Sequence, residues 1–323
     1  MGDAALGELM LHLRSLYGGD AEQALLQLAR EIGAERTAAL IEQARLPQLR
    51  CPRCAHNGFY RHGKANNLQR YRCQRCGRTF NCLTNTPLAR LRLKDRWPAY
   101  FDSLRDPACT VHRAADQVGV HANTSFRWRH RMLDWVKYDR PRTLQGIVEV
   151  DETFLLESEK GNKQLVRRAR KRGGVARRRG ISAEQVNIVV ARDRAGATVD
   201  FVAGRGALKV ASLDTHLLPK LERELERDTL LVTDGNPVYA RFARKARIAH
   251  SCVNVSEGVR VKGPIHVQNV NAYHSRFKAW LRHFHGVATR YLNNYLGWRW
   301  AIDMKRIDDA TRFLRAALGV FTT

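Results

Sequence analysis

The chain has 323 residues, of which 44% are hydrophobic and 27% are charged. It is therefore long enough for two or three folded domains, and too apolar to be disordered throughout. Its 56 Lys and Arg against 31 Asp and Glu give a formal charge of +25, which favours a polyanionic partner, most commonly nucleic acid, although a ribosome-associated or membrane-surface protein would share such a charge.

The sequence offers no signal for export or for a membrane. No stretch approaches the roughly 20 apolar residues that a spanning helix needs, and the first residues lack a basic segment followed by an apolar run. We therefore expect a cytoplasmic, nucleoid-associated protein. In that compartment cysteines stay reduced, so they are interpreted first as metal ligands or core residues.

The N-terminal region, residues 1–46, is predicted to be helical. Leucines recur at helical spacing at Leu6, Leu9, Leu13 and Leu16, and a second helical pattern follows. These stripes indicate helix-packing faces, with a role in oligomerisation as the alternative.

Two cysteine pairs predict a zinc ribbon over residues 47–90. Cys51 and Cys54 form one C-x2-C motif and Cys73 and Cys76 the other, and four thiolates close a tetrahedral structural zinc site with no open position. A redox pair is the weaker alternative. The remaining cysteines are interpreted as packing residues. The basic side chains around the pairs suit phosphate contact or, alternatively, only solvation; they are Arg53, Arg61, Lys64, Arg70, Arg72, Arg75 and Arg78.

The next region, residues 91–140, has the pattern of a helix-turn-helix. An inner face is predicted at Val111, Ala114, Ala115 and Val118. Gly119 supplies the turn, and Asn123 or Thr124 is expected to cap a second helix rich in arginine. An αα-hairpin without DNA contact is the alternative. The candidate DNA-contacting residues on the second helix are Arg127, Arg129 and Arg131, while Trp128 and Trp135 are expected to anchor it.

From residue 146 the pattern changes to short β runs, GIVEVD, VNIVVARD, GATVDFVAG and TLLVTDG, with a helical pattern at 209–227 before the last. A basic segment at 163–180 lies between the first two runs. Period-2 alternation places Glu149 and Asp151 on one face of the first strand and Val148, Val150 and Glu152 on the other. An exposed edge strand would explain the acids of this strand without any function.

A second aspartate suggests a different explanation. Asp234 follows a buried apolar run, and two aspartates borne by strands are a means of placing divalent ions for phosphoryl transfer. A later helix could add a third ligand, because Asn271, His274 and Lys278 share one helix face with Ser275. A satisfied polar helix face is the alternative.

The sequence resembles the ISXO-like group of bacterial insertion-sequence transposases. The resemblance rests on the CPRC and CQRC motifs and on AADQVGVHANTSFRWRHRML, GIVEVDETF, LLVTDG and HVQNVNAYHSRFKAWLRHFHGVATRYLNNYLGWRW, and it covers the chain from about residue 45. It implies a multidomain α+β protein in which residues 141–323 form an RNase H-like α/β catalytic domain of the DDE type. Its mixed sheet would begin with three antiparallel strands.

The resemblance also implies roles for individual residues. Asp151 and Asp234 match the first two catalytic acids. Asn271 stands where many such enzymes have Glu, and Lys278 follows seven residues later, as in some members of the group. The implied metal is Mg²⁺ or Mn²⁺ held by Asp151, Asp234 and Asn271. Glu149 is a candidate helper, and Glu152 is interpreted as structural.

The implied activity is cleavage of DNA at the ends of an insertion element, followed by strand transfer. Basic residues between the first two strands would clamp the DNA backbone; they include Arg168, Arg172 and Arg178. The partners are element ends and target DNA, and a homo-oligomer is expected in the synaptic complex. The alternatives are a non-catalytic DNA-binding relic or regulator derived from a transposase, and an RNase H-type nuclease without transposition.

Overall fold

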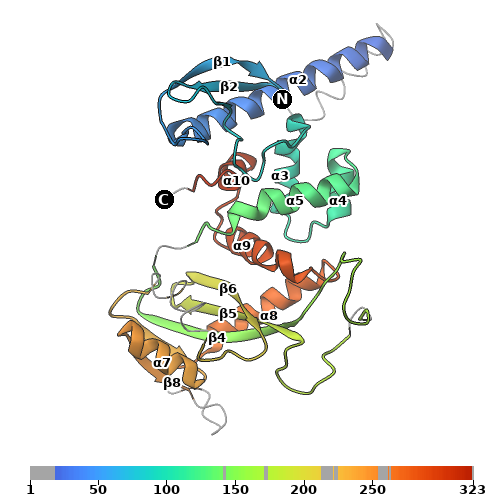
Figure 1. Ribbon diagram of the computed structural model, residues 1–323. Helices are drawn as coiled ribbons and strands as arrows, with labels where there is room; N and C mark the ends of the chain where they lie inside the picture. Colours follow the sequence, from blue (N-terminus) through green and yellow to red (C-terminus); the bar gives the residue numbers. More distant parts are fainter. Residues whose placement is uncertain are drawn as a thin grey trace. The chain divides into compact units, whose positions relative to one another are not determined.

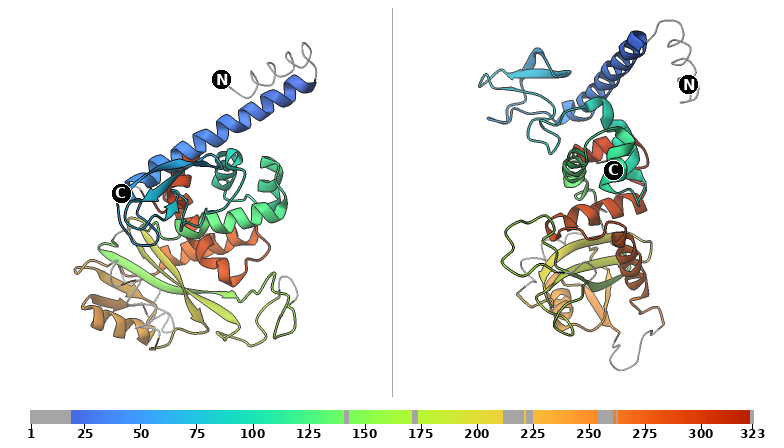
Figure 2. Two further views of the ribbon diagram at one scale, coloured as in Figure 1. Left: turned by 45° about the horizontal axis from the view of Figure 1, so that its top comes forward. Right: turned by 90° about the vertical axis from the view of Figure 1, so that its right-hand side faces the viewer.

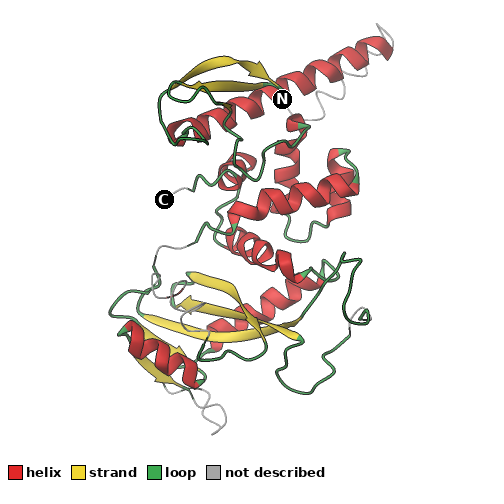
Figure 3. Cartoon of the chain, in the orientation of Figure 1, coloured by secondary structure: helices red, strands yellow, loops and turns green. Residues whose placement is uncertain are grey.

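The computed structural model describes residues 19–140, 143–170, 174–211, 221, 225–253, 261 and 263–321 (Figures 1 and 3). Three predictions fall wholly or largely outside this part of the chain: the leucine stripe before residue 17, the helix at 209–227 and Arg172. The chain divides into two compact units, residues 1–135 with 305–323, and residues 136–304. Residues 305–323 thus cluster with the first unit, whereas the resemblance implied that they belong to the catalytic domain.

The first unit contains five α-helices among its described residues: α2 (Gly19–Arg45), α3 (Trp97–Arg105), α4 (Val111–Val118), α5 (Ala122–Val136) and α10 (Ala310–Ala317). Aromatic side chains make up much of its apolar core. The rings of Phe101 and Phe313 lie 5.0 Å apart between centroids, and Tyr100 meets Trp128 edge-on at 5.2 Å. All four side chains are buried, so α10 closes the core that α3 and α5 begin.

A small antiparallel sheet follows α2. Its strands are β1 (Phe59–Ala65), β2 (Leu68–Cys73) and β3 (Thr79–Phe80), in the order β1-β2-β3. Asn66 and Asn67, the two residues between β1 and β2, have φ of 51° and 62°. Positive φ at both positions is typical of a type I′ hairpin turn, which asparagine accommodates better than most residues.

The helices α4 and α5 form the predicted helical pair. Gly119 ends α4 with φ 64°, and Ala114 and Ala115 are buried. The second helix begins at Ala122, earlier than expected. The N–H of Asn123 donates to His121 Nδ1 at 3.1 Å, so His121 acts as the cap in place of Asn123 or Thr124.

The second unit is built on a mixed five-stranded sheet. Its strands are β4 (Ile147–Leu156), β5 (Gln185–Asp193), β6 (Thr198–Arg205), β7 (Leu230–Thr233) and β8 (Ala249–Cys252), in the order β6-β5-β4-β7-β8. β4, β5 and β6 form an antiparallel meander, whereas β7 pairs parallel with β4 and β8 parallel with β7. The mixed sheet agrees with the expectation; the short and largely polar β8 was not predicted.

Among the described residues, three α-helices accompany this sheet: α7 (Pro237–Ala246), α8 (Gln268–Arg282) and α9 (Leu292–Asp303). Val148 and Val150 of β4 are fully buried in a core that includes Phe242 of α7. Alternate residues of β4 face the other way, toward α8, which contacts β4 and β5 (Figure 2). The acids that alternate with these valines therefore face α8.

Candidate active site

Asp151 and Asp234 lie beside each other on neighbouring parallel strands. In the register of β4 and β7, Val150 is opposite Thr233, and each aspartate is the next residue along its strand. Neighbouring strands lie about 4.8 Å apart, so the register alone brings the two carboxyl groups into one site. Asp151 lies within β4, while Asp234 follows the last residue of β7, and Gly235 then turns the chain with φ 94°.

The helix α8 places two further groups beside Asp151. His274 Nδ1 is 3.8 Å from Asp151 Oδ2, and Lys278 interacts electrostatically with the same carboxyl. His274 and Lys278 lie four residues apart and thus on one helix face. Asn271 lies on that face one turn before His274, and its side chain is exposed.

The acids of the site repel one another. Burial and the neighbouring Asp234 raise the pKa of Asp151 to about 6. Burial, together with Asp234 and Asp151, raises the pKa of Glu152 to about 7. Burial also lowers the pKa of Lys278, against the effect of Asp151. A carboxyl cluster whose ionised form is disfavoured in this way is stabilised by a cation, so the donor set fits a divalent metal such as Mg²⁺ or Mn²⁺.

His274 is a residue to which sequence reasoning gave no role. Its side chain is 6% exposed, and burial lowers its pKa to about 4, so the ring is neutral at physiological pH. Among the described residues its Nε2 has no hydrogen-bond partner. The signal was present in the sequence, because His274 shares a helix face with Asn271 and Lys278, but the family resemblance directed attention to those two residues.

Glu149 holds the N-terminus of α8. One carboxylate oxygen accepts a hydrogen bond from Asn269 Nδ2 at 2.9 Å and lies 2.8 Å from Arg194 Nη1; the other accepts the Val270 N–H at 2.9 Å. Asn269 and Val270 belong to the first turn of α8, where free N–H groups and the helix dipole favour an anion. Glu149 is fully buried and both of its oxygens are engaged, so we assign it to positioning α8 and not to holding metal.

Glu152 points away from α8. Its Oε1 accepts a hydrogen bond from Asn236 Nδ2 at 3.2 Å, and Asn236 caps α7. The interpretation of Glu152 as structural therefore has a physical basis, since it ties β4 to the start of α7. Its raised pKa shows that it also belongs to the electrostatics of the site.

The four predicted zinc ligands meet in the first unit. Cys51 Sγ lies 3.4 Å from Cys76 Sγ, and Cys54 Sγ lies 3.6 Å and 3.5 Å from the sulfurs of Cys73 and Cys76. All four sulfurs lie within 4.8 Å of one another. A tetrahedron with Zn–S bonds of about 2.3 Å has edges of roughly 3.8 Å, so the four-cysteine cluster fits one Zn²⁺. Zinc would here be structural, because four thiolates leave no position for a substrate.

The predicted DNA-contacting arginines differ in exposure. Arg127 is exposed and Arg131 is half-buried, with Nη2 donating to the Ala89 carbonyl at 2.6 Å. Arg129 is fully buried beside Tyr100 and Cys109. It is therefore a core residue in this structure, and we leave it out of the proposed DNA contacts. Arg168 and Arg178, between β4 and β5, are exposed.

A family model matches the part of the chain that contains this site. Residues 143–300 match the family model described as ISXO2-like transposase domain. A curated relative, described as an uncharacterized protein in transposable element ISH50 of Halobacterium salinarum, is 26% identical over 269 residues, which are 82% of this chain and 89% of the relative.

Among solved structures, the chain is similar to a pre-cleavage Mos1 transpososome, with 13% identity, a TM-score of 0.22 and coverage of 70% of this chain and 78% of the other. It is also similar to the Mos1 mariner paired end complex with Mn, with 15% identity, a TM-score of 0.26 and coverage of 69% and 75%.

Within the described residues, no helix is both long and apolar enough to cross a membrane. The family match spans β4, β5, β6, β7, α7 and α8, and so includes Asp151, Asp234 and the polar face of α8. Residues 143–300 thus match the ISXO2-like transposase domain, and the relative in ISH50 supports an insertion-sequence transposase.

Proposed function

We propose that the protein is a DNA transposase that cuts phosphodiester bonds at insertion-element ends and joins the freed 3′ ends to target DNA. One observation carries this proposal: Asp151 and Asp234 lie side by side on parallel strands, and burial and mutual repulsion raise the pKa of Asp151. The antiparallel meander followed by parallel β7 and β8 is the order expected of an RNase H-like domain, and we assign residues 141–304 to that class.

The residues of the site would share the work as follows. Asp151 and Asp234 would hold divalent metal, with the Asn271 amide oxygen as a third ligand from α8. When bound, the metal supplies Lewis-acid stabilisation of the attacking and leaving oxygens. Lys278, which is close to Asp151, would orient a phosphate. Asn271 contributes no charge, so the site depends more on the two aspartates than a site with three carboxylates does.

DNA binding would be divided between the units. The zinc ribbon and the α4–α5 pair would recognise element ends, with Arg127 and Arg131 among the contacts. Arg168 and Arg178 are exposed cations on the segment between β4 and β5, and with Arg172 they would hold the backbone of the DNA. Joining two ends to one target requires two catalytic centres, so we propose a homo-oligomer in the synaptic complex.

The test is metal-dependent nicking of DNA that carries the element end. The wild-type protein should nick it with Mg²⁺ or Mn²⁺ and join the 3′ end to a target plasmid. Asp151→Asn should lower the nicking rate by roughly 10⁴-fold, as when a central catalytic group is removed, while its Kd for the same DNA stays within about two-fold of wild type.

The two alternatives give different results. A DNA-binding relic or regulator would bind the end without nicking under any metal condition. A nuclease without transposition would cut DNA with no preference for the end and produce no joined product. Either outcome would overturn the proposal.

A further inference from the structure

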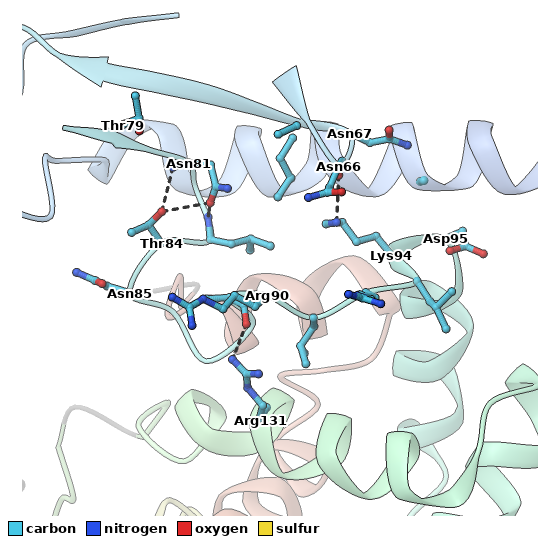
Figure 4. A pocket seen from close by; sticks show the side chains of 18 of the residues that line it. Asn66, Asn67, Thr79, Asn81, Thr84, Asn85, Arg90, Lys94, Asp95 and Arg131 are labelled. Atoms are coloured by element: carbon cyan, nitrogen blue, oxygen red, sulfur yellow. Dashed lines mark hydrogen bonds between the residues drawn. The ribbon is translucent and has the colours of Figure 1, made fainter. Parts of the chain in front are cut away.

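A polar groove in the first unit lies outside the four-cysteine site, and Arg131 of α5 is part of its lining. It runs between the β1–β2 turn and the connector of residues 81–95, and has a volume of about 1220 Å³ (Figure 4). We call it the ribbon groove and define it by Asn66, Asn67, Arg78, Arg90, Arg92 and Lys94. We propose that the ribbon groove binds the phosphodiester backbone of duplex DNA.

Two cations hold the walls of the ribbon groove together. Lys94 Nζ donates to the Asn66 carbonyl at 3.1 Å and joins the connector to the β1–β2 turn. Arg131 Nη2 donates to the Ala89 carbonyl at 2.6 Å and joins the connector to α5. Hydrogen bonds between elements of the unit therefore fix the walls of the groove. The predicted recognition helix, α5, forms part of its lining.

The other cations of the groove are left for a ligand. Arg78, Arg90 and Arg92 are exposed, and they form no salt bridge with any residue in the described part of the chain. Among the described residues that line the groove, Asp95 is the only acid, and Arg131 and Lys94 also line it. Asp95 is 3.8 Å from Arg96. Five cations against one acid make a strongly positive groove, which attracts a polyanion.

The composition of the lining selects the class of ligand. No aromatic side chain is among the described residues that line the groove, so it lacks the stacking surfaces on which single-stranded nucleic acid is held. It also lacks the mainly apolar walls of a small-molecule pocket. Arginine guanidinium groups and the amides of Asn66 and Asn67 are donors for phosphate oxygens. These features fit the regular phosphates of a duplex.

The backbone of the connector supports a binding role. Arg90 and Leu93 have φ of 62° and 56°, values that non-glycine residues seldom adopt outside Asn and Asp. Such conformations cost free energy and are concentrated at binding and catalytic sites. Here they bracket Arg92 in the segment that presents the exposed arginines.

The proposal rests on the proposed DNA-binding function and is tested separately from the chemistry. The variant is Arg90→Ala/Arg92→Ala in the whole protein. The matched control is Arg30→Ala/Arg36→Ala, which removes two exposed arginines of α2 that do not line the groove. Binding is measured as fluorescence anisotropy of a labelled duplex of several helical turns over a series of salt concentrations, with a single strand of the same sequence as competitor.

The groove variant should bind the duplex roughly ten-fold or more weakly at physiological salt. The slope of log K against log salt should fall by about 1.8, which is about 0.9 for each of the two phosphates that the variant no longer neutralises. Arg90→Lys/Arg92→Lys should recover much of the affinity, because lysine keeps the charge. The control should stay within about two-fold of wild type. Zinc content and circular dichroism establish that the groove variant is folded.

Three results would overturn the proposal: equal losses in the groove variant and the control, no loss in the groove variant, or displacement of the duplex by the single strand at lower concentration. Failure of the proposed function has a different signature. If wild type never nicks DNA but the groove variant still loses duplex binding, the groove stands and the catalytic proposal falls. If Asp151→Asn abolishes nicking while the groove variant binds normally, the reverse holds.

Discussion

At the scale of single residues, three carboxyl groups, one imidazole and the Lys278 ammonium group determine the electrostatics of the proposed catalytic site. Asp151 and Glu152 share one strand but face opposite sides of the sheet, and Asp234 affects the pKa of both. His274 lies against Asp151 as a neutral ring. The carboxylates of the site therefore repel one another when no cation is bound, and the packing of the fold offsets this unfavourable free energy.

Replacing Glu152 tests this repulsion. A carboxyl whose pKa is raised on folding, here from 4.5 to about 7, destabilises the native state as the pH rises through that window, and the loss is complete above pH 7. Glu152→Gln, measured by urea unfolding without added divalent cation, should therefore raise the unfolding free energy by about 1–2 kcal/mol at pH 8 and change it little at pH 4.5.

Glu35→Gln is the matched control, because Glu35 is an exposed residue of α2. The Glu35→Gln variant should change the unfolding free energy by a similarly small amount at pH 8 and pH 4.5. A Glu152→Gln variant that is equally stable relative to wild type at pH 8 and pH 4.5 would show that this carboxyl carries no repulsive cost.

At the scale of elements, the position of α8 determines whether its polar groups lie beside Asp151 and Asp234. Glu149 holds its first turn. Further along the helix, the Tyr273 hydroxyl hydrogen-bonds to Asp200 of β6, whose other oxygen lies 2.6 Å from Arg140 Nη2. Two buried carboxylates on different strands thus fix the helix that carries Asn271, His274 and Lys278.

Glu149→Gln should loosen this attachment. Gln loses the charge that the α8 N-terminus and Arg194 require, and breaking a buried ion pair typically costs 3–5 kcal/mol. Because Arg194 is 30% exposed, we expect a smaller loss of about 2 kcal/mol in urea unfolding. The Mg²⁺ concentration for half-maximal nicking should rise as well, because α8 carries the proposed third ligand. A variant that loses stability but keeps the wild-type Mg²⁺ dependence would limit Glu149 to a role in folding.

The four-cysteine cluster predicts that the fold of the ribbon depends on bound zinc. Cys54→Ser removes one thiolate, and zinc binding supplies much of the folding free energy of such small sites, about 10–16 kcal/mol in isolated peptides. Zinc measured by atomic spectrometry should fall from about one ion per chain to well below one, and duplex binding should weaken with it. Cys252→Ser, which changes an exposed cysteine outside the cluster, should retain the zinc; zinc retained in Cys54→Ser would contradict the assignment.

Sequence patterns predicted the elements of this protein better than their contacts. Alternation along GIVEVDETF correctly separated Glu149 and Asp151 from the valines, because strand periodicity is a local property. The engagement of Glu149 with α8 joins residues 149 and 270, and nothing local encodes such a contact. Arg129 shows the same limit: on a helix with Arg127 and Arg131 it was expected at the surface, but its position places it against Tyr100 in the core. The short β8 is mostly polar, so its own pattern does not predict a strand, and it pairs in parallel with β7.

At the scale of the whole molecule, the chain passes from the first unit to the second near residue 136 and returns near residue 305. The second unit is therefore an insertion within the first. The returning segment matters for packing, because Phe313 of α10 is fully buried against Phe101 of α3.

Removal of residues 305–323 should therefore damage the unit at the other end of the chain. The deletion uncovers Phe101 and its neighbours, and loss of a buried Phe alone costs about 3–5 kcal/mol. Limited proteolysis should cut within residues 19–135 of the shortened protein while residues 136–304 stay resistant. Resistance of both segments would show that α10 is dispensable.

This arrangement also imposes an order on biosynthesis. The ribosome makes the ribbon and the helical pair first, then all of residues 136–304, and only afterwards the helix that completes the first core. A nascent chain thus carries an unfinished first unit throughout the synthesis of the second unit. A polypeptide still attached to the ribosome has all of its proposed cutting residues before the unit proposed to recognise the element is complete, so the proposed recognition would mature last.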